Sequence, residues 1–166
     1  MVTRTSLEKE LLSLAGSVPD PELPVLTLEE LGVVRGVDVS DRGRVTVRLT
    51  PTYTGCPAIE AMSADIERVL HVHGVAEVSV ETVLSPAWST NDISAEGRRK
   101  LAEFGIAPPR PHGAASDGPV PLALAVRCPH CGSTETELLS RFSSTACKAL
   151  RRCVACQEPF DHFKEL

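Results

Sequence analysis

The sequence lacks a long apolar run. Hydrophobic residues make up 42% of its 166 positions, but no stretch approaches the roughly 20 apolar residues that cross a bilayer. Residues 1–10 carry charges where a signal peptide would need an apolar segment. We therefore expect a soluble, cytoplasmic protein that does not contact membranes.

The sequence also lacks an excess of positive charge. Its 17 Lys and Arg residues are outnumbered by 22 Asp and Glu residues, which gives a net charge of -5. The C-terminal residues 127–166 hold six basic and five acidic residues, so they form no basic patch either. Without such a patch, nucleic acid is not an expected partner.

Two motifs of independent enzymes are missing. The sequence contains neither the Glu-x-x-His motif of a di-iron helix bundle nor a glycine-rich nucleotide-binding loop. We therefore do not expect the chain to catalyse a reaction by itself.

Cysteine, in contrast, is concentrated near the C-terminus. Two Cys-x-x-Cys pairs are present, and their members are Cys128, Cys131, Cys153 and Cys156. Because the chain shows no export signal, the pairs indicate a metal site more than disulfides. Two residues between thiolates let both sulfurs face one ion, and two pairs complete a tetrahedral shell. The pattern predicts a zinc ribbon, with rubredoxin-like iron or redox dithiols as the alternatives.

The metal is expected to be structural. About forty residues bury too little apolar surface to fold unaided, so the ion would supply the missing stability. His130 and His162 lie close to the pairs, but four cysteines already complete the shell. Cys147 is left over, either as a small buried side chain or as a thiol that contacts a partner or a metal centre.

Composition divides the chain into parts. Residues 107–122 are rich in Pro and Gly, which predicts a linker between a first domain, 1–106, and a metal module, 123–166. The first domain is predicted to be α+β, with helices covering one face of a sheet. Its expected helices span 6–15, 27–31, 57–73 and 94–104, and its expected strands span 33–39, 45–49 and 76–84.

Cys56 lies in the loop 50–57, which joins a strand to the long helix. At a helix cap, the helix dipole and the free N–H groups favour thiolate over thiol. The thiol could be a nucleophile, a persulfide carrier or a soft-metal ligand, or it could simply pack under the loop. His71 and His73 follow at the far end of the helix, about 22 Å away at about 1.5 Å per residue, so neither can activate it as in a thiol hydrolase.

Several segments resemble known families. The motif at 20–25, which contains Asp20 and Glu22, is similar to that of SufT-like iron–sulfur assembly proteins, and so is the loop 50–57. Spacing alone would make Asp20-Pro-Glu22 only a turn. Over nearly the whole length, the segments 85–88, 105–109, 144–149 and 158–161 resemble PaaD proteins. These are the D subunits of bacterial phenylacetyl-CoA epoxidase (ring 1,2-monooxygenase) systems.

The resemblance implies a role in aerobic phenylacetate degradation. It implies a non-catalytic accessory subunit that works with a di-iron oxygenase or a reductase and helps to mature an iron or iron–sulfur centre. Cys56 would then be a functional thiol beside Asp20 and Glu22, and iron or a cluster would bind only transiently. The alternative is an electron-transfer component with a redox-active metal on the ribbon.

Overall fold

The computed structural model describes residues 4–110 and 125–165, which fall into two compact units. The first unit spans 1–97 and the second spans 98–166. No helix in the described ranges is long and apolar enough to span a membrane.

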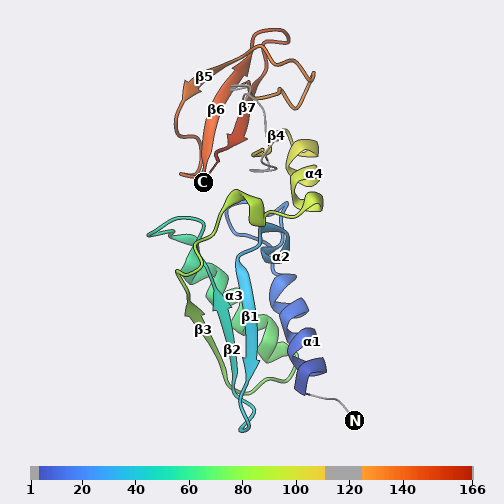
Figure 1. The fold of residues 1–166 in the computed structure, drawn as a ribbon, viewed down its shortest axis with the longest axis vertical. Helices are drawn as coiled ribbons and strands as arrows, with labels where there is room; N and C mark the ends of the chain where they lie inside the picture. Colours follow the sequence, from blue (N-terminus) through green and yellow to red (C-terminus); the bar gives the residue numbers. More distant parts are fainter. Residues whose placement is uncertain (1–3, 111–124, 166) are drawn as a thin grey trace, which may run out of the picture. The chain divides into compact units, whose positions relative to one another are not determined.

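The first unit is built on a three-stranded sheet with the order β1-β2-β3 (Figure 1). Strands β1 and β2 pair antiparallel as a hairpin, and β2 and β3 pair parallel. The parallel pair is possible because α3 crosses between the two strands. In chain order the elements are α1 (Arg4–Gly16), α2 (Leu28–Leu31), β1 (Val34–Val39), β2 (Val45–Leu49), α3 (Ala58–Val72), β3 (Val78–Thr82) and the short 3-10 helix η1 (Thr90–Asp92).

The core of this unit lies between the sheet and helices α1 and α3. On β2, Val45, Val47 and Leu49 are buried and alternate with partly exposed residues, as expected for a sheet covered on one face. Helix α3 contributes Met62, Ile66 and Leu70 at intervals of four, which places them on one side. Helix α1 contacts both β1 and α3, so the predicted α+β arrangement is confirmed.

Helix α2 shows the predicted capping box. The Glu30 N–H donates to Thr27 Oγ1 at 3.2 Å, and the Thr27 N–H donates to Glu30 Oε2 at 2.9 Å. Trp88, from the segment after β3, is buried and donates its Nε1–H to the carbonyl of Leu31 at 2.9 Å. These bonds fix the short helix although its four residues are too few to be stable by themselves.

The second unit is a four-stranded sheet with the order β4-β7-β6-β5. Three of its strands form an antiparallel meander, and β4 adds to β7 in parallel. The chain enters this unit within α4 (Ala95–Glu103) and continues through β4 (Ile106–Ala107), β5 (Thr136–Ser140), β6 (Lys148–Cys153) and β7 (Pro159–Phe163).

The limits of the units differ from the predicted domain limits. Composition assigns Ala107 to the linker, but Ala107 pairs with His162 and Ile106 pairs with Asp161. A two-residue strand has no periodicity that a sequence could reveal, because its partner lies far along the chain. Most of the predicted linker, 111–122, lies outside the described residues, and the domain limits 1–106 and 123–166 stay a prediction.

Candidate functional site

The two Cys-x-x-Cys pairs of the second unit form turns of the same shape. After Cys131, Gly132 has φ +77° and its N–H donates to the carbonyl of Cys128 at 2.9 Å. After Cys156, Gln157 has φ +65° and its N–H donates to the carbonyl of Cys153 at 3.0 Å. A residue in the left-handed backbone conformation directly after each pair closes the turn and directs both sulfurs inward.

The four sulfurs meet at one point. All four Sγ atoms lie within 4.8 Å of one another, with Cys128 and Cys156 3.8 Å apart and Cys131 and Cys153 3.5 Å apart. A disulfide would need about 2.05 Å, whereas a tetrahedral ion with bonds of about 2.3 Å places neighbouring sulfurs about 3.8 Å apart. The donor set therefore fits a four-coordinate soft metal ion, and these four cysteines are the group that could hold one.

The pKa values of neighbouring thiols in this cluster shift in opposite directions. The N–H of Cys156 donates to Cys153 Sγ at 3.5 Å and is the largest cause that lowers the pKa of the Cys153 thiol to about 7. Burial and the hydrogen bonds with the other cysteine sulfurs raise the pKa of the Cys156 thiol. A thiolate, not a thiol, is the form that binds metal.

The neighbouring side chains lie outside this cluster. His130 is exposed, and no histidine belongs to a metal-binding group among the described residues. Cys147 is only 4% exposed, and its sulfur lies 3.1 Å from Thr145 Oγ1. Its placement is that of a small buried side chain within the ribbon.

The first unit holds the predicted acidic motif in a tight loop. Pro19 and Thr27 form a β-bridge, and the Asp20 N–H donates to the carbonyl of Leu26 at 2.9 Å. Oxygen Oδ1 of Asp20 accepts the N–H groups of Glu22 at 2.9 Å and Leu23 at 2.7 Å. Asp20 is 5% exposed, and burial raises the pKa of its carboxyl despite these two bonds. Asp20 therefore braces the turn, as spacing alone suggests.

Cys56 is buried directly before α3, which begins at Ala58, one residue later than expected. Burial raises the pKa of its thiol, and the carboxylates of Glu22 and Asp20 raise it further. The N–H of Ala58 and the side chain of Tyr53 oppose this rise without overcoming it. The expectation that the helix dipole favours thiolate is therefore wrong, because burial and two negative charges outweigh the helix terminus.

Asp20 and Glu22 precede Cys56 by more than thirty positions in the sequence. The fold brings their carboxylates close enough to the Cys56 thiol to raise its pKa. Their ligand atoms do not converge as the four sulfurs do, since only the four cysteines form a metal-binding group among the described residues. The site is thus a thiol whose pKa is raised, in a negative environment. Such an environment disfavours a thiolate but favours a bound cation.

Thr50 is a residue of this region that the sequence did not single out. It opens the loop that ends at Cys56, it is 1% exposed, and its Oγ1 has no hydrogen-bond partner among the described residues. Buried hydroxyls are rarely left unpaired. The sequence gives no signal that the hydroxyl of a threonine after a strand is unpaired. Whether a hydrogen-bond partner lies within reach depends on tertiary packing.

Replacement of Glu22 by glutamine is expected to make Cys56 react faster with iodoacetamide near neutral pH. Removing the negative charge lowers the pKa of the Cys56 thiol, so more thiolate is present at a given pH. Mass spectrometry of the Cys56 peptide against time and pH measures the rate. The matched control is Glu67→Gln, on α3 but absent from the causes of the Cys56 shift. Equal rates in wild type and Glu22→Gln would contradict the electrostatic coupling.

Two protein-family models match separate parts of the chain. Residues 8–81 match the family described as iron-sulfur cluster assembly protein. Residues 114–164 match the family described as PaaD zinc beta ribbon domain. The first match contains Asp20, Glu22 and Cys56, and the second contains all four cysteines of the metal site.

Similar proteins fall into the same two groups. A protein of Escherichia coli, named as the putative D subunit of 1,2-phenylacetyl-CoA epoxidase, is 45% identical over 93% of this chain and 91% of its own length. An "Fe-S protein maturation auxiliary factor" of Porphyromonas gingivalis is 34% identical over 57% of this chain and 90% of its own length.

A solved structure agrees with the first unit. The crystal structure titled as a domain of unknown function, DUF59, from Bacillus anthracis matches with a TM-score of 0.55 and 29% identity. It covers 59% of this chain and 93% of its own. These shorter relatives match 57% and 59% of this chain, a share similar to that of the first unit.

Proposed function

The chain belongs to the family of phenylacetyl-CoA epoxidase D subunits, and from this premise we propose that it is a non-catalytic accessory subunit of such a system. Its role would be to help mature an iron or iron–sulfur centre in the di-iron oxygenase or the reductase. The partners would be those other subunits.

The observation that carries this proposal is the position of Cys56. The thiol lies close enough to Asp20 and Glu22 for both carboxylates to raise its pKa, and all three are in the unit that matches iron–sulfur assembly proteins. Relatives made of little more than this unit are named as iron–sulfur protein maturation factors. The working part of an accessory subunit would then be the first unit.

The electrostatics suit transient binding of a cation. When ferrous iron, the cargo, bonds to Cys56 Sγ, the thiol proton leaves to solvent and the two carboxylates offset the charge of the ion. Because the pKa of the thiol is raised, protons compete with the ion for the sulfur. Competition of this kind keeps the metal exchangeable, as a carrier needs.

For the ribbon we infer zinc in a structural role. Four thiolates close the coordination shell, so the ion has no open position for a substrate. Iron fits the same four sulfurs, and an iron-loaded ribbon would make the chain an electron-transfer component instead. The two functions differ in colour, because zinc thiolates have no visible absorption.

An anaerobic titration with ferrous iron tests the proposal. The purified full-length protein is expected to contain zinc and to lack a visible band before iron is added. Added iron should produce a saturable sulfur-to-iron charge-transfer band in wild type and in Cys147→Ser, but not in Cys56→Ser, with zinc content unchanged in all three. A band of equal size in Cys56→Ser would reject Cys56 as the ligand. An intense band before the addition would favour electron transfer.

A further inference from the structure

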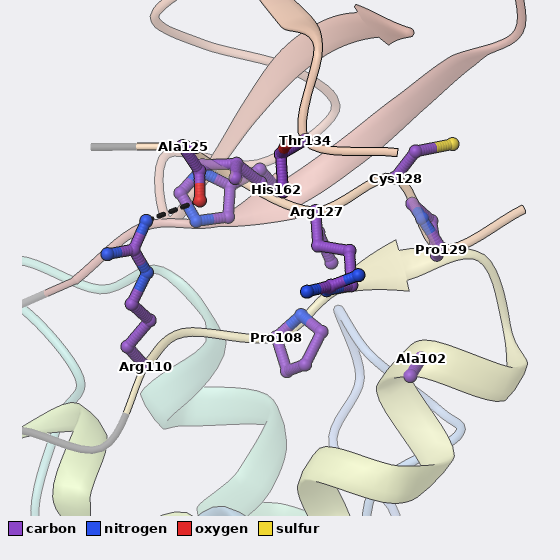
Figure 2. A pocket seen from close by; sticks show the side chains of 11 residues that line it. Ala102, Pro108, Arg110, Ala125, Arg127, Cys128, Pro129, Thr134 and His162 are labelled. Carbon is purple, nitrogen blue, oxygen red and sulfur yellow. Dashed lines mark hydrogen bonds between the residues drawn. The ribbon is translucent and has the colours of Figure 1, made fainter. Parts of the chain in front are cut away.

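A pocket of about 510 Å³ lies within the second unit, beside the metal site (Figure 2). Its lining residues come from α4, from β4 and the chain that follows it, from the chain before the first cysteine pair, from that pair and the turn after it, and from β7. The volume is within the range of about 300–1,000 Å³ that is typical of small-molecule sites. The proposed iron function does not use this pocket.

Most of the lining is apolar. The apolar contributions come from small or rigid residues, namely Ala102, Ala107, Pro108, Ala125, Val126 and Pro129. Ala107 is in β4, so the unexpected strand helps to build the pocket. A wall of this kind offers an aromatic or aliphatic body contact area without polar groups to desolvate.

The charge at the pocket is of one sign. Arg110 and Arg127 both line it, and none of the lining residues within 4–110 and 125–165 is Asp or Glu. This is unusual for a chain with a net charge of -5. An anion is the ligand charge that such a lining favours.

Both guanidinium groups keep donors for a ligand. Arg127 donates from one terminal nitrogen to the carbonyl of Gly132 at 2.8 Å, and Arg110 donates to the carbonyl of Ala125. Neither arginine has a carboxylate partner among the described residues. Each guanidinium carries five N–H donors, so most remain for a bidentate acceptor.

His162 supplies a neutral polar group to the same pocket. Burial, together with the charges of Arg151 and Arg110, lowers the pKa of its imidazole to about 4, while the charge of Glu165 opposes this shift. The ring is therefore uncharged near neutral pH and can accept or donate one hydrogen bond. The positive charge of the pocket comes from its arginines.

We propose that this pocket binds a small organic carboxylate, with the carboxylate on Arg110 and Arg127 and an apolar body against the Ala and Pro wall. Inorganic anions match only the arginines, and neutral apolar molecules match only the wall. An amphipathic anion matches both halves. Phenylacetate is a suitable probe, since phenylacetamide has the same shape without the charge.

Isothermal titration calorimetry of the full-length, metal-loaded protein with phenylacetate tests this proposal. Saturable binding is expected, with much weaker binding of phenylacetamide and of inorganic phosphate. Arg110→Gln and Arg127→Gln should each weaken the affinity by about tenfold, because each removes a charge-assisted hydrogen bond. Arg141→Gln, at an exposed arginine of the ribbon outside the lining, is the matched control.

Metal content is measured in every variant, because Arg127 also bonds the first cysteine turn. If Arg127→Gln loses metal, Arg110→Gln decides the outcome. In NMR spectra, phenylacetate should shift the His162 ring signals in wild type. The proposal is overturned by no binding at millimolar phenylacetate, by equal binding of the amide, or by equal affinities in Arg110→Gln and Arg141→Gln.

Discussion

Replacement of Cys153 by serine is expected to release the metal and unfold the second unit while the first unit stays folded. Cys153 is fully buried at the end of β6, and its sulfur lies 3.5 Å from that of Cys131. Metal binding contributes an apparent 10–16 kcal/mol, roughly, in small zinc modules, and loss of one thiolate removes much of it. The effect on the stability of the ribbon should therefore be large.

The apolar packing around the four sulfurs explains this sensitivity. One buried cluster of the second unit consists of Ala107, Cys128, Cys153 and Phe160, with Val126 and Cys156 packed against it. Three of these six residues belong to the four-cysteine group, so an ion held there would be part of this cluster. Loss of the ion leaves too little apolar burial to offset the entropy of ordering the chain.

The first unit is expected to be unaffected, because relatives of similar length to this unit exist as separate proteins. Metal analysis and amide NMR spectra measure both effects in one sample. Cys147→Ser is the matched control: it removes a buried cysteine of the same unit that is not in the cluster, and it should retain metal. A Cys153→Ser protein with full metal content and dispersed ribbon signals would contradict the account.

The sequence was most informative where local chemistry decides the structure. The cysteine spacing predicted the four-sulfur cluster, because two residues between thiolates restrict the turn that joins them. The box of Thr27 and Glu30 predicted a helix of only four residues, since both partners lie within one turn. The face of α3 followed from the intervals between Met62, Ile66 and Leu70.

The sequence was least informative where distant segments meet. The raised pKa of Cys56 depends on Glu22 and Asp20, whose approach is set by the fold of the loop at 20–26. An argument from the helix cap considers only the neighbours in sequence, and it therefore predicted a lowered pKa for the Cys56 thiol where the structure gives a raised one. The pocket was missed for the same reason, since Arg110, Arg127 and His162 come from separate segments.

Replacement of Cys56 by serine is expected to have the largest effect on function. A serine hydroxyl is a much poorer ligand for iron than a thiolate, and it cannot carry sulfur. The side chains are similar in size, and Cys56 is far in sequence from the ribbon, so folding and zinc content should not change. If the thiol handles iron for a partner, the partner alone should show the defect.

The iron content of the epoxidase made together with this protein tests that claim most directly. The complex is produced with wild type, with Cys56→Ser and with the control Cys147→Ser, and iron is measured per oxygenase and per reductase subunit alongside activity. We expect a several-fold loss of iron and activity with Cys56→Ser only, and the subunit that loses iron is then the client. A fully iron-loaded, active complex with Cys56→Ser would contradict the assembly role of this thiol.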